Sequence, residues 1–127
     1  MDSAPVLERR WAQLAGLGWI GKHKQLIAEN IGSYCFIGTL LLNTEFEPTS
    51  VSQNKCGTCT KCIDACPTNA LDNGNLDARK CISYLTIENR DEIPEEFRDK
   101  ISGCVVGCDI CQEAMPQPQL MTQDRLH

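Results

Sequence analysis

Cys56-Gly-Thr-Cys59-Thr-Lys-Cys62-Ile-Asp-Ala-Cys66-Pro67 decides the fold of this chain. The four cysteines follow the spacing C-x2-C-x2-C-x3-C-P, which is typical of bacterial iron–sulfur proteins. Thiolates at this short spacing can wrap three corners of one cubane cluster, while the fourth, Cys66, binds a second cluster. Pro67 ends the turn, because proline has a fixed φ and no N–H to donate. The spacing therefore predicts iron–sulfur binding.

Two other uses of the nine cysteines compete with this interpretation. A zinc site with four thiolates needs two C-x2-C pairs, which Cys56/Cys59 and Cys108/Cys111 would supply. That interpretation leaves Cys62, Cys66 and Cys81 without a purpose. A disulfide framework is disfavoured by the odd number of cysteines and by the lack of an apolar signal-peptide core at the N-terminus. Reduced, metal-bound cysteines fit a cytoplasmic protein better.

Composition limits the remaining possibilities. A chain of 127 residues allows one domain, or one small domain and a fragment of another. No apolar stretch approaches the roughly 18 residues that a membrane span requires, so we expect no membrane contact. The net charge of −5 repels phosphate, so we do not expect this chain to hold nucleic acid by itself.

The hydrophobic pattern predicts a few short elements separated by turns. They are a helix over 3–16, a buried strand over 34–42, a turn at Asp72–Asn75, a helix over 77–88 and a short helix opening at Pro94. The region 43–55 is poor in apolar residues, so we place a domain boundary there. The sequence therefore predicts an α+β chain of two domains, 1–47 and 48–118, followed by a disordered tail over 119–127.

Two four-iron clusters require eight thiolates, and the crossed arrangement assigns seven of them. Three cysteines begin the first cluster: Cys56, Cys59 and Cys62. Four cysteines complete the second: Cys66, Cys81, Cys108 and Cys111.

The position of the eighth ligand, x3 after Cys111, holds Met115, which precedes Pro116. A thioether lacks the negative charge of a thiolate. We therefore expect the first cluster to be incomplete or more sensitive to oxygen than the second. Cys35 and Cys104 are the two remaining thiols, and we expect both to be small buried apolar residues.

Several motifs, in order along the chain, resemble the epoxyqueuosine reductase family. They are Asp2-Ser-Ala-Pro-Val-Leu-Glu, Ala15-Gly-Leu-Gly-Trp-Ile-Gly-Lys-His23, Leu76-Asp-Ala-Arg-Lys-Cys-Ile-Ser-Tyr-Leu-Thr-Ile-Glu88, Ile93-Pro-Glu-Glu and Gly107-Cys-Asp-Ile-Cys111. That family reduces the epoxide of epoxyqueuosine in a tRNA anticodon to give queuosine, with a cobalamin and two 4Fe–4S clusters, and is related to reductive dehalogenases. The resemblance covers roughly residues 2–116.

The resemblance implies an architecture and an activity. Residues 1–47 would be the C-terminal part of a larger α/β cobalamin-binding catalytic domain, and 48–118 a ferredoxin-like lobe with two clusters. The chain would be an internal fragment of an iron–sulfur oxidoreductase of tRNA queuosine biosynthesis, inactive alone. A tRNA substrate, an external electron donor and a monomeric state belong to the same expectation.

The resemblance also implies roles for individual residues. Asp2 aligns with the proposed proton donor of the family, and a carboxylic acid can protonate the oxygen that leaves the carbon. Ser83, Cys108 and Asp109 resemble positions near the corrin. Without the resemblance, Asp2 would be a solvated terminal residue or a helix cap.

Residues of the N-terminal segment have less specific roles. Lys22 and His23 could reach the cofactor or a tRNA phosphate, or lie in a solvated loop. Trp11 and Trp19 are expected to be packing residues.

The alternative function is a two-cluster ferredoxin-type module that transfers electrons to another enzyme. Residues 2–42 separate the two hypotheses, because a plain electron carrier needs no such segment. A zinc-stapled interaction domain is a third possibility, which metal analysis would test.

Overall fold

The computed structural model describes residues 6–72, 74–101 and 103–115. Short helices and two small antiparallel sheets make the chain α+β, as predicted. The described residues form two compact units. Unit 1 comprises residues 6–21 and 25–57, and unit 2 comprises 22–24 and the described part of 58–115. The domain boundary within 43–55 stays a prediction.

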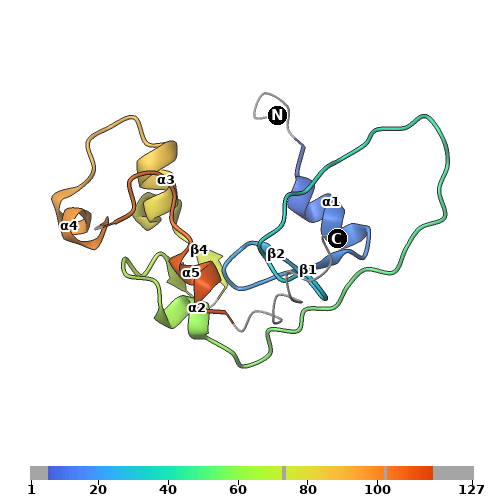
Figure 1. The fold of residues 1–127 in the computed structure, drawn as a ribbon, viewed down its shortest axis with the longest axis horizontal. Helices are drawn as coiled ribbons and strands as arrows, with labels where there is room; N and C mark the ends of the chain where they lie inside the picture. Colours follow the sequence, from blue (N-terminus) through green and yellow to red (C-terminus); the bar gives the residue numbers. More distant parts are fainter. Residues whose placement is uncertain (1–5, 73, 102, 116–127) are drawn as a thin grey trace, which may run out of the picture. The chain divides into compact units, whose positions relative to one another are not determined.

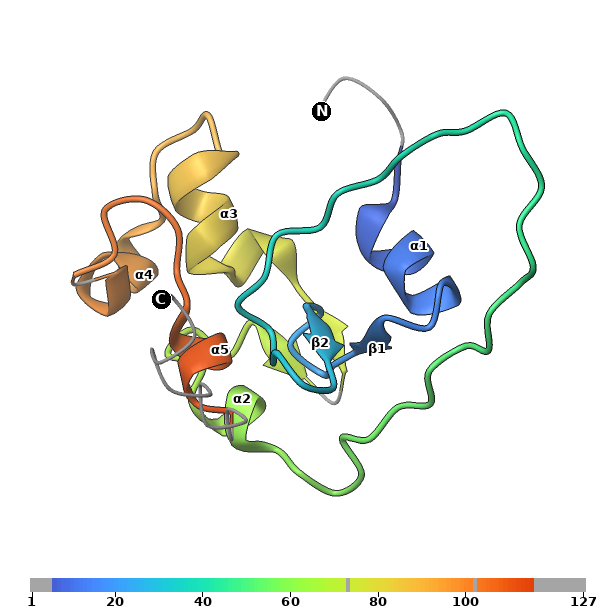
Figure 2. The same cartoon turned by 45° about the vertical axis from the view of Figure 1, so that its right-hand side comes forward.

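Unit 1 consists of one helix and one hairpin. Helix α1 (Glu8–Leu14) precedes strands β1 (Gly18–Ile20) and β2 (Leu26–Ala28), which pair antiparallel with Trp19 opposite Ile27. The helix lies against the hairpin in both ribbon views (Figures 1 and 2). Its contact residues are small or aliphatic, and the buried side chains are Ala12, Leu26 and Ala28. The predicted helix is thus present within 3–16, of which residues 3–5 lie outside the described residues.

The two tryptophans differ in their surroundings. Trp19 is half-buried in the hairpin, with the Lys55 ammonium 5.8 Å from the centre of its ring. Trp11 is mostly exposed on α1, so the prediction that it packs is wrong for the described residues.

The prediction of a buried strand over 34–42 is also wrong. This segment runs extended without strand pairing, and within the described residues no backbone hydrogen bond joins 36–42 to another strand. Phe36 is fully exposed, and Leu40 and Leu41 are nearly so. An apolar pattern predicts that the side chains will be buried by other parts of a protein. A strand also requires a neighbouring strand for its backbone hydrogen bonds. Unit 1 supplies neither.

Unit 2 is built from very short elements. They are α2 (Lys61–Asp64), β3 (Leu71–Asp72), β4 (Asn75–Leu76), the 3₁₀ helix η1 (Ala78–Lys80), α3 (Ile82–Ile87), α4 (Glu95–Arg98), the 3₁₀ helix η2 (Asp99–Ile101) and α5 (Ile110–Glu113). Strands β3 and β4 flank the turn predicted at Asp72–Asn75. The helix predicted over 77–88 is divided into η1 and α3, and α4 opens after Pro94 as predicted.

The apolar core of unit 2 is small. Its buried hydrophobic residues are Cys62, Ala70, Leu71, Ile82, Leu85 and Phe97. A core of this size stabilises a domain weakly, and small domains of this kind commonly depend on bound metal. In the described ranges, no helix has the length and apolar character needed to cross a membrane.

Gly18 provides a test of the hairpin. A β-carbon at this position would lie 2.1 Å from the carbonyl oxygen of Ile27, across the strand pair. Gly18→Ala must therefore displace backbone, and we expect it to lower the free energy of unfolding by about 1–3 kcal/mol. Gly38→Ala is the matched control, because a β-carbon added there would meet no atom within 4 Å. It should change stability by less than about 0.5 kcal/mol. Urea unfolding of the iron-loaded protein, followed by circular dichroism, measures both, and equal stabilities would contradict the hairpin geometry.

Candidate iron–sulfur centre

Helices α2 and α5 bring the cysteine loops of unit 2 together. The two helices pack against each other, and they carry Cys62 and Cys111 (Figure 1). Cys81 comes from a third element, because it lies at the N-terminal end of α3. Of the cysteines, Cys35 and Cys56 belong to unit 1, whereas the others belong to unit 2.

The Cys111 thiol lies in the middle of this group. Two effects together raise its pKa to about 11. The larger is burial, and the smaller is repulsion between negative charges on this thiol and on those of Cys108, Cys66, Cys81 and Cys62. Such repulsion acts only between groups that are close together. The structure therefore gathers the four cysteines assigned to the second cluster, with Cys62 beside them. Bound iron would offset the repulsion, because a metal cation favours the deprotonated thiol.

Cys66 has a different environment, in which hydrogen bonds to sulfur dominate. Burial raises the pKa of its thiol, but hydrogen bonds from Thr68, Ala70 and Leu71 outweigh burial, and the net effect lowers this pKa. The N–H of Ala70 lies 3.3 Å from the sulfur, and the Thr68 hydroxyl oxygen lies 3.6 Å from it. Hydrogen bonds of this kind stabilise a thiolate and tune the potential of a cluster that the thiolate binds.

The donor set suits a cluster better than a single metal ion. Within 6–72, 74–101 and 103–115, no three His, Cys, Asp or Glu side chains are arranged to hold one metal ion. A zinc site needs four ligands within about 2.0–2.3 Å of one centre, whereas a cubane distributes its thiolates over four irons. The gathered side chains are also all thiols, the ligand that iron–sulfur clusters require.

Cys104 and Cys35 are both less buried than the sequence analysis predicted. We expected Cys104 to be a buried apolar residue, but its side chain is half-exposed and forms a hydrogen bond with the Cys108 thiol. Burial raises the pKa of Cys108, and the nearness of Cys104 raises it as well. Cys35, the other residue expected to be buried, is also half-exposed. The available signal was the close spacing of Cys104, within the Gly103–Gly107 loop, and Cys108, directly after it.

The residues assigned near the corrin lie around this group. Ser83 is half-buried on α3, two residues after Cys81. Asp109 precedes α5, is exposed, and accepts a hydrogen bond of 3.4 Å from the Gln112 side chain. Asp2 lies outside the described residues.

Lys22 and His23, which link β1 to β2, belong to unit 2. The Lys22 ammonium donates a hydrogen bond of 2.9 Å to the carbonyl oxygen of Cys59. His23 is buried, and burial lowers its pKa to about 4. Its ring is therefore neutral near neutral pH and supplies no positive charge for a phosphate, whereas Lys22 contacts the cysteine loop itself.

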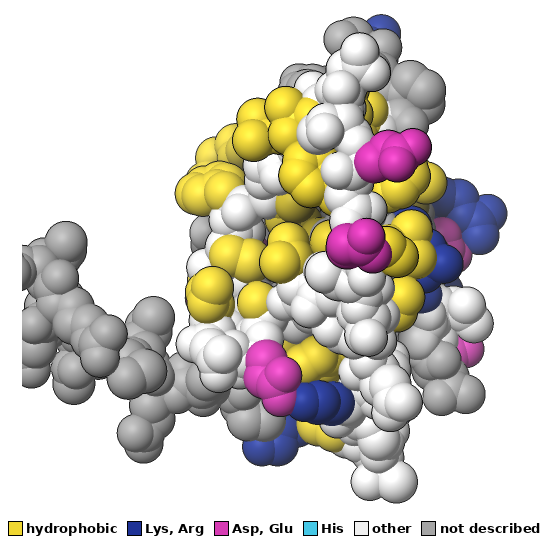
Figure 3. Space-filling model, turned by 90° about the vertical axis from the view of Figure 1, so that its right-hand side faces the viewer, with side chains coloured by type: hydrophobic (Ala, Val, Ile, Leu, Met, Phe, Trp, Pro, Cys, Tyr) yellow, Lys and Arg dark blue, Asp and Glu magenta, His cyan; other side chains and the backbone are white. Residues whose placement is uncertain are grey.

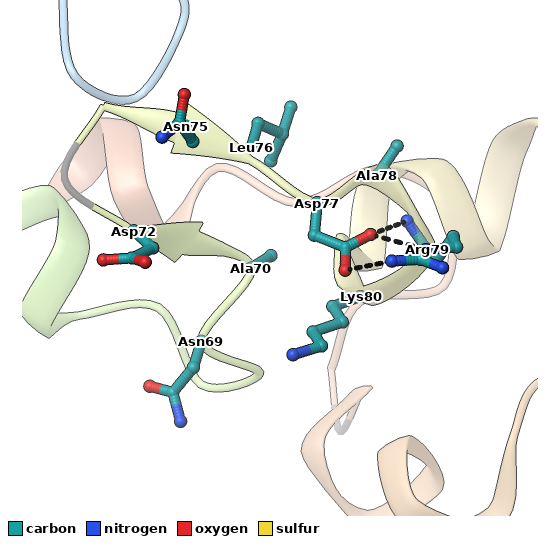
Figure 4. A pocket seen from close by; sticks show the side chains of 9 residues that line it. All are labelled: Asn69, Ala70, Asp72, Asn75, Leu76, Asp77, Ala78, Arg79 and Lys80. Carbon is teal, nitrogen blue, oxygen red and sulfur yellow. Dashed lines mark hydrogen bonds and ion pairs between the residues drawn. The ribbon is translucent and has the colours of Figure 1, made fainter.

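A pocket of about 580 Å³ lies at the β3–β4 hairpin and η1 of unit 2 (Figure 4). Its lining residues are Asn69, Ala70, Asp72, Asn75, Leu76, Asp77, Ala78, Arg79 and Lys80. The Asp77 carboxylate accepts two hydrogen bonds of 2.9 Å from the Arg79 guanidinium and one of 3.1 Å from the Arg79 N–H. The Asp77–Arg79 pair fixes the start of η1. Because η1 leads directly to Cys81, the pair helps to position that cysteine.

Residues 55–117 match the family model described as a 4Fe-4S double cluster binding domain. The chain is 54% identical, over 91% of its length, to the epoxyqueuosine reductase of Aliivibrio fischeri, of which it covers 32%. It resembles a crystal structure of an epoxyqueuosine reductase with an epoxyqueuosine-modified tRNA stem loop, with a TM-score of 0.85 and 40% identity, covering 92% of this chain and 31% of that one.

A Bacillus subtilis epoxyqueuosine reductase, solved with its catalytic aspartate loop swung out of the active site, gives a TM-score of 0.82 and 41% identity. The match covers 88% of this chain and 30% of that one. The chain thus spans about a third of the length of these relatives.

The substitution Cys81→Ser tests which cysteines bind the second cluster. Cys81→Ser removes one thiolate from the second group, so we expect the protein to lose roughly half of its iron and acid-labile sulfide after anaerobic reconstitution. Cys35→Ser is the matched control and should keep the wild-type content. Equal loss in both variants, or in neither, would contradict the assignment of Cys81.

A second prediction concerns Thr68. Thr68→Val removes a hydrogen bond to the Cys66 sulfur at nearly constant volume. Because this bond favours the more negatively charged, reduced cluster, the reduction potential of the second cluster should fall. Redox titration followed by electron paramagnetic resonance (EPR) measures the change. Thr44→Val, at an exposed position of unit 1, should leave the potential unaltered. An unchanged potential in the Thr68 variant would show that this hydroxyl does not act on the cluster.

Proposed function

The chain belongs to the epoxyqueuosine reductase family, and from this premise we propose that it takes part in reducing epoxyqueuosine in tRNA to queuosine. The observation that carries the proposal is 54% identity to such a reductase over 91% of the chain. The double-cluster match over 55–117 and the group of thiols around Cys111 support it independently. Because the chain spans only about a third of its relatives, the activity of the whole enzyme needs the other parts that the relatives possess.

In this proposal, residues 48–118 are a ferredoxin-like lobe that relays electrons. A 4Fe–4S cluster accepts and passes on one electron at a time at low potential. Cys66, Cys81, Cys108 and Cys111 hold the second cluster, and the hydrogen bonds to Cys66 adjust its potential. Lys22 fixes the loop at Cys59 through its carbonyl oxygen.

Residues 1–47 are proposed to be the C-terminal part of a larger α/β domain that binds cobalamin. The support is the uncovered apolar segment 34–42, which alternates between half-buried and exposed side chains from Tyr34 to Leu40. Figure 3 shows hydrophobic side chains on the face seen from the side of this segment, with acidic side chains among them. Exposed apolar areas of this kind are typical of interfaces. The remaining strands of the proposed domain would cover the segment.

The cofactor and proton-donor roles rest on named side chains. Cobalamin, when bound, supplies a strongly reducing, nucleophilic metal centre. The Ser83 hydroxyl and the Asp109 carboxylate, next to Cys108, are suited to hydrogen-bond its amide side chains. Asp2 donates the proton to the oxygen that leaves the epoxide carbon. The catalytic aspartate loop of the Bacillus subtilis relative supports this role.

The same proposal covers the partners and the setting of the protein. The tRNA substrate is held mainly by parts of the enzyme outside this chain, because a net charge of −5 attracts no phosphate. An external donor reduces the clusters. A monomer in the cytoplasm, where thiols stay reduced, completes the proposal.

A chimera tests the function. Residues 2–116, carrying Met115→Cys, replace the matching third of the Aliivibrio fischeri reductase. We expect the chimera to convert epoxyqueuosine to queuosine in tRNA, measured by mass spectrometry of digested tRNA, while the 127-residue chain alone shows little conversion. In the chimera, Asp2→Asn should slow turnover by roughly 10²–10⁴-fold with unchanged iron content. Asp91→Asn, at an exposed loop position, is the control and should not slow it.

Two results would contradict parts of this proposal. A chimera with full cluster content and no conversion would favour the ferredoxin-type electron carrier. Normal turnover by the Asp2→Asn chimera would remove Asp2 from the mechanism.

A further inference from the structure

The two cysteine loops of unit 2 repeat the same backbone conformation. Residues 59–66 read Cys-x2-Cys-x3-Cys, and 108–115 read Cys-x2-Cys-x3-Met, with an offset of 49 positions. Thr60 and Asp109 cap α2 and α5 with nearly equal dihedral angles, φ −124° and ψ 5° against φ −111° and ψ 5°. The two helices therefore start in the same way.

Their hydrogen bonds also correspond one by one. The Thr60 carbonyl accepts bonds of 2.8 and 2.9 Å from the N–H groups three and four residues later, and the Asp109 carbonyl accepts two of 2.8 Å from the equivalent groups. The N–H of Cys66 then donates to the carbonyl three residues earlier at 3.1 Å, and that of Met115 does the same at 3.3 Å. Met115 therefore occupies the position in its loop that Cys66 occupies in the other.

This correspondence determines what Met115 replaces. Cys66 follows the loop that begins the first cluster, yet its thiol raises the pKa of Cys111 more than the Cys62 thiol does, so it lies with the second group. By the same geometry, a thiolate at position 115 would serve the cluster of the Cys62 loop. Methionine places a neutral thioether there instead, so the first cluster lacks a thiolate at its fourth iron.

No neighbouring thiol makes good this loss in the described part of unit 2. Cys104 is the spare thiol of the unit, but it lies beside Cys108, whose pKa it raises, and Cys108 is assigned to the second cluster. The first cluster is thus left with three cysteines: Cys56, Cys59 and Cys62.

We propose that the fourth iron of the first cluster is an open coordination site that binds an exogenous small thiol. The inference rests on the proposed binding of two clusters. Iron in such clusters prefers thiolate sulfur, so a thiol binds as RS⁻ and releases its proton to solvent, without a redox change. Without that ligand, one-electron oxidation ejects the open iron: [4Fe–4S]²⁺ gives [3Fe–4S]⁺, Fe²⁺ and one electron, which ferricyanide takes up to become ferrocyanide.

The experiment uses the whole chain, reconstituted anaerobically and freed of small thiols. One equivalent of ferricyanide should produce the EPR signal of a three-iron cluster and release about one iron per chain. Prior addition of 2-mercaptoethanol should suppress both effects. In Met115→Cys the oxidant should produce neither, because the new thiolate closes the site. Cys104→Ser and Cys35→Ser are matched controls and should behave like the wild type. Met115→Ala should also behave like the wild type.

Each contrary result has its own meaning. Failure of the wild type to bind any iron–sulfur cluster would overturn the proposed function and this inference with it. Two four-iron clusters that resist ferricyanide would overturn the inference alone. Loss of the first cluster in Cys104→Ser or Cys35→Ser would identify that cysteine as the fourth ligand. Sensitivity that appears only in Met115→Ala would show that the thioether binds the iron.

Discussion

The gathering of half-buried thiols around Cys111 is the constraint on which unit 2 depends, because burial and neighbouring thiolates both disfavour the charged form that binds iron. The pKa of Cys111 rises to about 11, first because burial disfavours the thiolate and then because four nearby cysteines would repel its negative charge. The surrounding elements cannot offset this cost, since α2 and α5 have four residues each and the core holds few large side chains. Helices this short are unstable alone. Bound iron would stabilise the thiolates and connect the elements that carry them. We therefore expect folding to be coupled to metal loading.

The sequence predicted the parts of the fold that depend on local chemistry. The turn at Asp72–Asn75 and the helix after Pro94 were found because turn and capping residues act over a few positions. Segment 34–42 was misassigned for the opposite reason. Its apolar pattern requires cover, but the pattern does not say whether the covering layer is present in the same chain.

The candidate site divides in the same way. Cysteine spacing predicted the ligands of both loops, because a cluster imposes its dimensions on a short segment. The contact between Cys104 and Cys108 was missed, since Cys104 follows no motif and the contact arises from the loop between two glycines with positive φ. The equivalence of Cys66 and Met115 was visible as spacing, but only the matching hydrogen bonds give it structural meaning.

The uncovered segment 34–42 has a consequence for how the chain behaves in concentrated solution. An extended stretch with exposed apolar side chains can pair with the same stretch of another molecule, in the manner of an aggregating edge strand. Glu45, Glu47 and Pro48 follow it within six residues. Acidic residues and proline at the border of an apolar stretch act as gatekeepers against such pairing. The segment therefore has an apolar surface that another part of the protein would cover, and it is followed by residues that oppose pairing between molecules.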